Sequence, residues 1–280
     1  MLHQQAKVVI VGAGPGDPEL LTIKAVRWLQ RADVVLADRL VSEDILREFV
    51  RPGAEIIPVG KQAHKGASTP QAQINELLVL HARAGKLVVR LKGGDVSIFS
   101  NVLDELETLV QNGIPYEIVP GITAALGAAA YAGIPLTARR HATAVRFLTC
   151  YQPHLLPDKH WKELAATDDT LVFYMSGEQL ELIVEKLRRN GISTDKQLAL
   201  VEQATTPAQR VTVANLYENI ASYLPDAIAS PSLLIIGRVV GLHHQFAWLA
   251  NGKDAEEYFQ PVAARLFPWE EETGQQLQTA

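Results

Sequence analysis

The chain has 280 residues, of which 48% are apolar and 20% are charged. This length allows one large domain or two modest ones, and the composition is that of a globular protein with a buried core, which excludes a disordered chain. Lys and Arg number 26 against 31 Asp and Glu, and the resulting charge of −5 argues against a protein that coats duplex nucleic acid.

The single cysteine, Cys150, excludes an intrachain disulfide and a zinc site built from cysteines, and it fits a reducing compartment. Its simplest role is that of a small buried apolar residue. The first residues lack the pattern of a signal peptide, and the most apolar stretch, 122–136, is interrupted by glycine and proline. We therefore expect a cytoplasmic protein with no membrane partner.

The first half of the chain alternates apolar runs with amphipathic segments. We expect strands at 7–11, 34–37, 55–59, 86–91 and 116–119. Helices are expected over 18–30, 42–49 and 123–132, with two more whose apolar faces run from Ile74 to His81 and from Val102 to Val110. This alternation predicts a parallel sheet with helices packed on it.

A basic connector, 133–141, leads to a second alternating block. Its expected strands are 144–149, 170–174, 197–201, 210–212 and 232–236, and Leu180, Ile183, Val184 and Leu187 form a helix face between them. The sequence thus predicts two α/β domains of unequal size, at 1–138 and 139–250, followed by a loosely packed tail at 251–280.

The first motif, GAGPGD, follows a strand and opens a helix. Its backbone either passes close to a ligand or forms a tight turn without one. A dinucleotide fingerprint requires a third glycine where this chain has Asp17, and Pro15 removes a backbone donor. The carboxylate of Asp17 would also cap the free N–H groups that a pyrophosphate needs. The motif therefore disfavours a nicotinamide dinucleotide.

Two further irregular loops follow predicted strands, at Lys92-Gly93-Gly94-Asp95 and at Pro120-Gly121-Ile122-Thr123. In open parallel sheets the ligand crevice lies beyond the carboxyl ends of the strands. We therefore expect these two loops and the GAGPGD loop to line one site at one edge of the sheet.

Several single residues also lie at strand ends. From their surroundings alone, Asp38 is a solvated turn residue paired with Arg39, Lys61 is a surface lysine, and Met175 fills the core. His64, His141, His243 and His244 show no arrangement with a third ligand, so we expect no metal site.

The motifs occur in the order VGAGPGDPELLT, ADRLVSEDIL, VGK, RLKGGD, VPGITAALGAAAYAGIPLT and FYM. Over about residues 7 to 240 this arrangement resembles the uroporphyrinogen-III C-methyltransferases of the tetrapyrrole methylase superfamily. The resemblance implies two α/β domains with the active site in the cleft between them, the class III methyltransferase fold, commonly as a homodimer. It also implies transfer of two methyl groups from S-adenosylmethionine to C2 and C7 of uroporphyrinogen III. The products would be S-adenosylhomocysteine and precorrin-2, a precursor of sirohaem and cobalamin.

The resemblance also implies roles for particular residues. Asp38 would be the proton acceptor and Lys61 the proton donor. The family's contacts with S-adenosylmethionine fall on Pro15, Gly93, Gly94, Asp95, Ile98, Thr123, Ala124, Met175 and Ala204. The substrate that the resemblance implies is a tetrapyrrole, a small molecule with eight carboxylates, for which we expect cationic partners at Arg39, Lys61, Lys65, Arg139 and Arg140.

Two segments depart from the family pattern. After Asp95 the chain reads VSIFSNV, without the family's arginine and paired glycines, and Thr149-Cys150-Tyr151 replaces TGH. Three alternatives remain: a methylase of a later corrinoid precursor, a NAD-dependent oxidoreductase, and a module that binds S-adenosylmethionine without catalysis.

Overall fold

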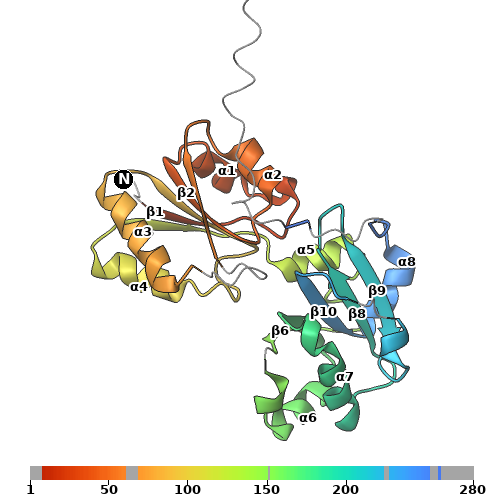
Figure 1. Cartoon of the computed structure of the whole chain (residues 1–280). Coiled ribbons are helices and arrows are strands. Elements are labelled where there is room, and N and C mark those ends of the chain that lie inside the picture. The colour runs from red at the N-terminus through yellow and green to blue at the C-terminus, as the bar shows by residue number, and fades with distance from the viewer. Residues whose placement is uncertain (1–7, 61–68, 151, 224–226, 253–257, 260–280) are drawn as a thin grey trace, which may run out of the picture. The chain divides into compact units, whose positions relative to one another are not determined.

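The structure is a computed structural model, and it describes residues 8–60, 69–150, 152–223, 227–252 and 258–259. These residues form two compact units (Figure 1). The first contains 8–13, 21–60, 69–121 and Phe259, and the second contains the described residues of 14–20 and 122–258. The two α/β units expected from the alternating pattern are thus present.

The first unit is built on a fully parallel sheet. Its strand order is β3 (Glu55–Val59), β2 (Val34–Asp38), β4 (Val88–Lys92), β1 (Val8–Gly12) and β5 (Tyr116–Val119). All five residues of β1 and of β4 are buried, as expected for central strands covered on both faces. The predicted parallel sheet is confirmed.

Helices cover both faces of this sheet. α1 (Ile23–Leu29) and α2 (Glu43–Phe49) pack on the face that includes Val9 and Val35. α3 (Gln71–Arg83) and α4 (Leu103–Gln111) pack on the opposite face, against Ile10 and Leu36. Alternate residues of one strand therefore enter two different cores, as the pleat of a strand requires.

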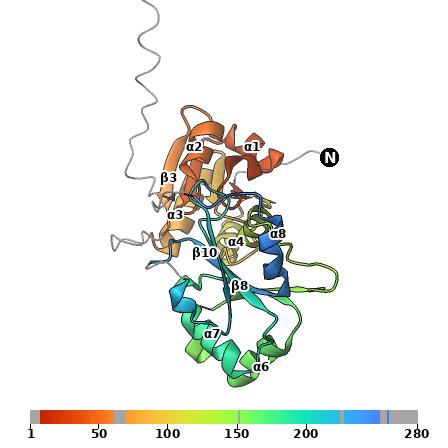
Figure 2. The same ribbon diagram turned by 90° about the vertical axis from the view of Figure 1, so that its right-hand side faces the viewer.

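The second unit holds a mixed sheet. Its order is β6 (Val145–Thr149), β7 (Thr170–Tyr174), β10 (Ser232–Gly237), β8 (Gln197–Glu202) and β9 (Arg210–Asn215). Only β6 and β7 pair in parallel, and the other neighbours are antiparallel. α6 (Asp158–Ala166) and α7 (Leu180–Arg189) lie side by side over one face (Figures 1 and 2).

The core under these two helices confirms two predictions. Leu180, Ile183, Val184 and Leu187 are all buried in it, as the predicted helix face requires. Cys150 lies in the same core, and burial raises the pKa of its thiol to about 11. A short helix, α8 (His243–Phe246), follows a 3₁₀ turn at Arg238–Leu242.

The division between the units follows packing rather than chain order. α5 (Ala124–Tyr131) packs against β10, so the helix that sequence reasoning assigned to residues 1–138 belongs to the second unit. The 14–20 segment joins that unit too, because the Asp17 N–H donates to Thr205 Oγ1 at 3.1 Å. Of the predicted tail, Asn251 is tied to β9 by two hydrogen bonds with Val211, and residues 253–257 and 260–280 lie outside the described part.

One predicted helix starts later than expected. Pro18–Leu20 forms a single 3₁₀ turn, and α1 begins only after Thr22, whose Oγ1 accepts the Ala25 N–H at 3.2 Å. Asp17 therefore does not cap α1. No helix in the described part of the chain combines the length and apolar character needed to cross a bilayer.

Candidate functional site

The parallel register of the first unit brings its strand-end loops to one edge. Gly12 at the end of β1 lies opposite Lys92 of β4, and Asp38 at the end of β2 lies opposite Val59 of β3. The loops that follow β4 and β5 therefore start at the same edge of the sheet, as predicted.

Three glycines at this edge pack backbone against backbone. A Cβ added to Gly121 would lie 2.3 Å from the carbonyl oxygen of Gly94 and 2.8 Å from the carbonyl carbon of Gly12. A Cβ added to Gly12 would lie 2.6 Å from the amide nitrogen of Gly121. No side chain fits between these loops, so glycine is required at both positions for a steric reason.

Asp95 fastens two of these loops together. Its Oδ2 accepts the Gly121 N–H at 2.9 Å, and its Oδ1 accepts the Ser97 N–H at 2.8 Å and the Ser97 hydroxyl at 2.5 Å. Desolvation raises the pKa of Asp95, but the bonds from Ser97, Gly121 and Val96 together outweigh it and the pKa is lowered. Asp95 is thus a carboxylate at neutral pH, held by backbone amides beside Gly94.

The segment after Asp95 has an unusual backbone. Phe99 and Asn101 adopt the left-handed region, with φ of 51° and 53°, and Phe99 is 44% exposed. Ile98, a predicted contact of S-adenosylmethionine, is half-buried. Positive φ in a non-glycine residue costs free energy, so this segment is strained where the sequence departs from the family pattern.

Asp38 is held at the end of β2. Its Oδ1 accepts the backbone N–H of Arg39 at 3.1 Å, and its Oδ2 lies 4.0 Å from Nη2 of Arg90. A Cβ on Gly60 would come within 2.6 Å of Oδ1, so the loop after β3 also closes on this carboxylate. The predicted contact of Asp38 with Arg39 is present, but through the backbone amide. Lys61 and Lys65 lie outside the described residues.

Sequence reasoning missed a buried charged cluster next to Asp38. Arg90 and Lys92 of β4 both bind Oε1 of Glu105 on α4, at 2.9 and 3.0 Å. All three side chains are buried. The signal was present in the sequence, because Arg90 lies within a strand that was expected to be buried and Lys92 follows two residues later.

In the second unit, the loop at Pro15 packs against α5 and the loop after β8. A Cβ on Gly127 would lie 2.5 Å from Cγ of Pro15, and a Cβ on Gly16 would lie 3.2 Å from the carbonyl oxygen of Ala204. The structure therefore brings Pro15 and Ala204 together. Thr205, beside Ala204, has a φ of 65° and its N–H donates to Gln209 Oε1 at 2.8 Å.

A second group in this unit surrounds the start of α5. The hydroxyl of Tyr174 lies 2.7 Å from Thr123 Oγ1 and accepts the Ala125 N–H at 3.1 Å. Thr123 and Ala124 are thereby fixed to the end of β7. Met175, the next residue along the chain, has a φ of 53° and is 57% exposed. The interpretation of Met175 as a core residue is therefore wrong, because the left-handed backbone turns the chain out of the sheet at that point.

The predicted substrate cations of the second unit lie on a turn. Ala138 and Ala142 pair as a short antiparallel bridge, and Arg139 and Arg140 are exposed at its tip. Arg140 has a φ of 70°. Arg39, in the first unit, is half-buried. Within the described ranges, no three His, Cys, Asp or Glu side chains gather as metal ligands.

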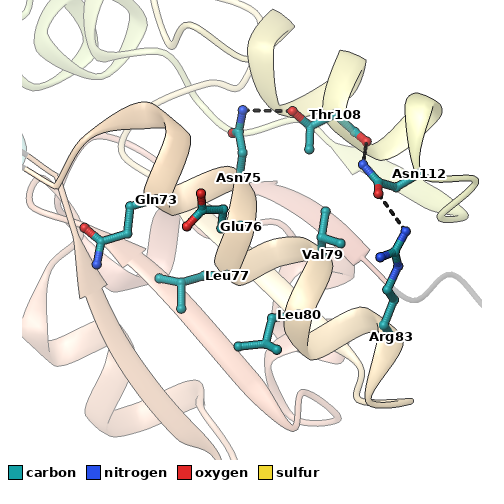
Figure 3. A pocket seen from close by; sticks show the side chains of 9 residues that line it. All are labelled: Gln73, Asn75, Glu76, Leu77, Val79, Leu80, Arg83, Thr108 and Asn112. Atoms are coloured by element: carbon teal, nitrogen blue, oxygen red, sulfur yellow. Dashed lines mark hydrogen bonds between the residues drawn. The ribbon is translucent and has the colours of Figure 1, made fainter.

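A groove of about 640 Å³ on α3 and α4 contains none of these predicted residues (Figure 3). Leu77, Val79 and Leu80 supply its apolar lining. Its polar rim is internally bonded: Asn75 Nδ2 donates to Thr108 Oγ1 at 2.8 Å, and Arg83 Nη2 donates to Asn112 Oδ1 at 2.8 Å. These two bonds hold the two helices together, and the groove shares no residue with the strand-end loops.

Comparison with known proteins places the chain among tetrapyrrole enzymes. A family model described as Tetrapyrrole (Corrin/Porphyrin) Methylases matches residues 7–219. The siroheme synthase of Neisseria meningitidis serogroup C / serotype 2a is 46% identical over 282 residues, which cover 99% of this chain and 56% of that protein. The chain thus spans about half the length of this relative.

Solved structures give the same result. The crystal structure of uroporphyrin-III-C-methyltransferase from Thermus thermophilus has a TM-score of 0.71 and 36% identity, and covers 88% of this chain and 98% of its own. A crystal structure of that enzyme complexed with S-adenosylhomocysteine has a TM-score of 0.69 and 38% identity, covering 84% of this chain and 93% of its own.

Proposed function

Because this chain belongs to the tetrapyrrole (corrin/porphyrin) methylase family, we propose that it transfers methyl groups from S-adenosylmethionine to C2 and C7 of uroporphyrinogen III. The products are precorrin-2, formed through precorrin-1, and S-adenosylhomocysteine. The observation that carries this proposal is the glycine-closed edge of the first unit, where Asp95 lies beside Gly94 and Gly121 at the family's donor motif.

The residues present fit a sulfonium donor. The sulfonium is positively charged, and Asp95 is an ionised carboxylate within the loops that the family uses for donor contacts. Gly93 lacks a side chain where Leu40 fills the space, 2.8 Å from an added Cβ to Leu40 Cβ, and the backbone groups of Gly93 and Gly94 are the proposed donor contacts. In the second unit, Pro15, Thr123, Ala124, Met175 and Ala204 supply the remaining contacts. The donor provides an already activated methyl group, so the protein's task is to align it with a ring carbon.

Proton transfer falls to the first unit. After methylation the ring system carries a positive charge, and loss of a proton from the ring returns the electron pair to it. Asp38, about one-third exposed, accepts that proton, and Lys61 is the proposed donor. Arg39, Lys65, Arg139 and Arg140 pair with substrate carboxylates, for which a guanidinium is the best-suited partner. An unchanged KM for uroporphyrinogen III after Arg139→Ala and Arg140→Ala would remove those two arginines from this role.

The test is anaerobic incubation with enzymatically made uroporphyrinogen III and labelled S-adenosylmethionine, followed by mass analysis of the tetrapyrrole. We expect a doubly methylated product from the wild type and little turnover from Asp38→Asn. Donor binding without methyl transfer would indicate a binding module. Methylation of a later corrinoid precursor in place of uroporphyrinogen III would indicate the alternative methylase. Equilibrium dialysis against NAD tests the oxidoreductase alternative.

We also propose a homodimer, which follows from the family resemblance, and a cytoplasmic location, which follows from the single cysteine and the reducing compartment that it fits. Light scattering of the purified chain tests the first, and a monomer at micromolar concentration would contradict it.

A further inference from the structure

The buried cluster in the first unit lies on the strand next to the one that ends in Asp38. Arg90 and Lys92 point to the same face of β4 because they are two residues apart, and α4 covers that face. Arg90 Nε and Lys92 Nζ both donate to Oε1 of Glu105, whose side chain is fully buried. Two cations thus share one carboxylate oxygen in the core.

This cluster is a poor device for stability. Removing several charges from water costs more than their mutual attraction usually returns, and apolar residues of similar volume would do as well or better. Within the described residues Glu105 Oε2 has no hydrogen-bond partner, which adds to the cost. Burial lowers the pKa of Lys92, and neighbouring Arg90 lowers it further, against the opposing effect of Glu105. The cluster therefore calls for an explanation other than folding energy.

The guanidinium of Arg90 lies between two strands. Its Nη1 donates to the carbonyl oxygens of Leu36 on β2 and Leu91 on β4, at 3.3 and 3.2 Å. Nε is occupied by Glu105, so Nη2 is the atom directed at Asp38, 4.0 Å from Oδ2. At that distance the contact is an ion pair rather than a hydrogen bond.

Asp38 is thus confined from two directions. The Arg39 N–H binds Oδ1, the backbone of Gly60 closes on the same oxygen, and Arg90 faces Oδ2. The orientation of the Asp38 carboxylate and the positive charge next to it therefore both depend on Arg90, which Glu105 and two strand carbonyls hold in place.

We propose that Arg90, anchored by Glu105, is a positioning residue that fixes the orientation of the Asp38 carboxylate for proton acceptance. The inference deepens the proposed function and rests on it. Arg90 acts through Asp38 and needs no contact with either substrate. Lys92 keeps Glu105 neutralised when Arg90 is absent, which makes the role of Arg90 separable by mutation.

A double-mutant cycle tests this proposal in the full chain. Arg90→Met leaves the Glu105–Lys92 pair intact, and we expect it to lower kcat for uroporphyrinogen III methylation by about 10- to 100-fold, the effect of a misplaced catalytic group. KM for both substrates should change less than about twofold, since binding is not involved. In an Asp38→Asn background the same substitution should change kcat less than about twofold, because the group it positions is gone.

A control comes from the opposite end of β2. Arg51 Nη2 binds Asp33 Oδ1 at 2.6 Å, and Asp33 immediately precedes that strand. Arg51→Met therefore removes an arginine–carboxylate contact next to the start of the same strand, and it should leave kcat within about twofold of the wild type. If Arg90→Met does not fold, as judged by circular dichroism, Arg90→Lys replaces it, because an ammonium keeps the charge but lacks the planar fork.

The outcomes separate the inference from the function on which it rests. An unchanged kcat in Arg90→Met, or in Arg90→Lys if that variant is used, or an equal loss in both backgrounds, overturns the positioning role. No methylation by the wild type instead overturns the proposed function, and full activity in Asp38→Asn overturns the assignment of Asp38 as proton acceptor. The role of Arg90 falls with either. Loss confined to KM would assign Arg90 to substrate binding and would also overturn the inference.

Discussion

Gly121→Ala is the most direct test of the glycine-closed edge. The new methyl group would lie 2.3 Å from the Gly94 carbonyl oxygen and 2.8 Å from the Gly12 carbonyl carbon. Both neighbours are backbone atoms of loops that leave central strands, so neither can rotate away as a side chain would. The clash has to be relieved by moving the backbone around Gly94 or Gly121.

Overpacking of this kind typically costs about 1–3 kcal/mol, and more where backbone has to move. For a chain of this size each kcal/mol lowers Tm by about 2–4 °C, so we expect a fall of about 2–12 °C. The same movement displaces Gly94 and breaks the Asp95 bond to Gly121, and we expect affinity for S-adenosylmethionine to fall by at least about tenfold, or 1.4 kcal/mol.

Calorimetry measures both quantities, as a thermal transition and as a binding isotherm. Gly241→Ala is the matched control, because its added Cβ would meet only Gln197 Oε1, at 3.4 Å, and its φ lies outside the left-handed region. If Gly121→Ala had the same Tm and the same affinity for S-adenosylmethionine as Gly241→Ala, the close packing of the three loops and its link to donor binding would both be refuted.

Three further predictions concern single side chains. Tyr174→Phe removes the hydroxyl that is hydrogen-bonded to Thr123 and to the Ala125 N–H. The free energy of unfolding measured in urea should fall by about 1–3 kcal/mol, and affinity for S-adenosylmethionine should also fall. Unchanged values would contradict the role of these bonds in holding the start of α5. The lowered pKa of Asp95 means that its contribution to stability is complete at neutral pH and is lost below about pH 4, so the difference between wild type and Asp95→Asn should shrink from pH 7 to pH 3, whereas a constant difference would refute the assignment. The thiol of Cys150, buried and with a pKa of about 11, should react with iodoacetamide at pH 8 only after unfolding; rapid labelling of the native protein would contradict its placement.

The strands β2, β3, β5 and β7 were predictable because each is a short run of mostly apolar residues. β3, β5 and β7 occupy the predicted residues, and β2 is longer by Asp38 alone. β7 is buried along its whole length, whereas β3 and β5 lie at the sheet edges and expose some of their residues, so what these three strands share is the apolar run and not burial on both faces. The helices were less certain. Val110 was expected on the buried face of α4 but is exposed, since that short helix turns only one stripe toward the sheet.

Long-range contacts explain why α1 starts after Thr22 and not after Asp17, and why α5 packs in the second unit. Local sequence makes Asp17-Pro18 a good helix start, and Asp17 Oδ1 does accept the Glu19 N–H of the 3₁₀ turn at 2.8 Å. Its Oδ2 accepts the hydroxyl of Tyr131 at 2.5 Å. Desolvation, and after it the contact with Asp17, raise the pKa of Tyr131 to about 12. Tyr131 is more than one hundred residues away in the chain, so no local pattern reveals the pair.

Residues with a strained backbone form the part of the candidate site that no sequence pattern could reveal. Within the described residues, the non-glycine positions with positive φ are Phe99, Asn101, Arg140, Met175, Gln203 and Thr205. Each lies in a loop or turn that contains a residue predicted to contact S-adenosylmethionine or the tetrapyrrole. Strain of this kind persists only where the surrounding structure imposes it, and it concentrates at functional sites. The glycines mark where backbones must approach each other, which sequence does reveal. The buried charges of β4 and these left-handed residues break local preferences without a glycine to signal it, so only their three-dimensional neighbours explain them.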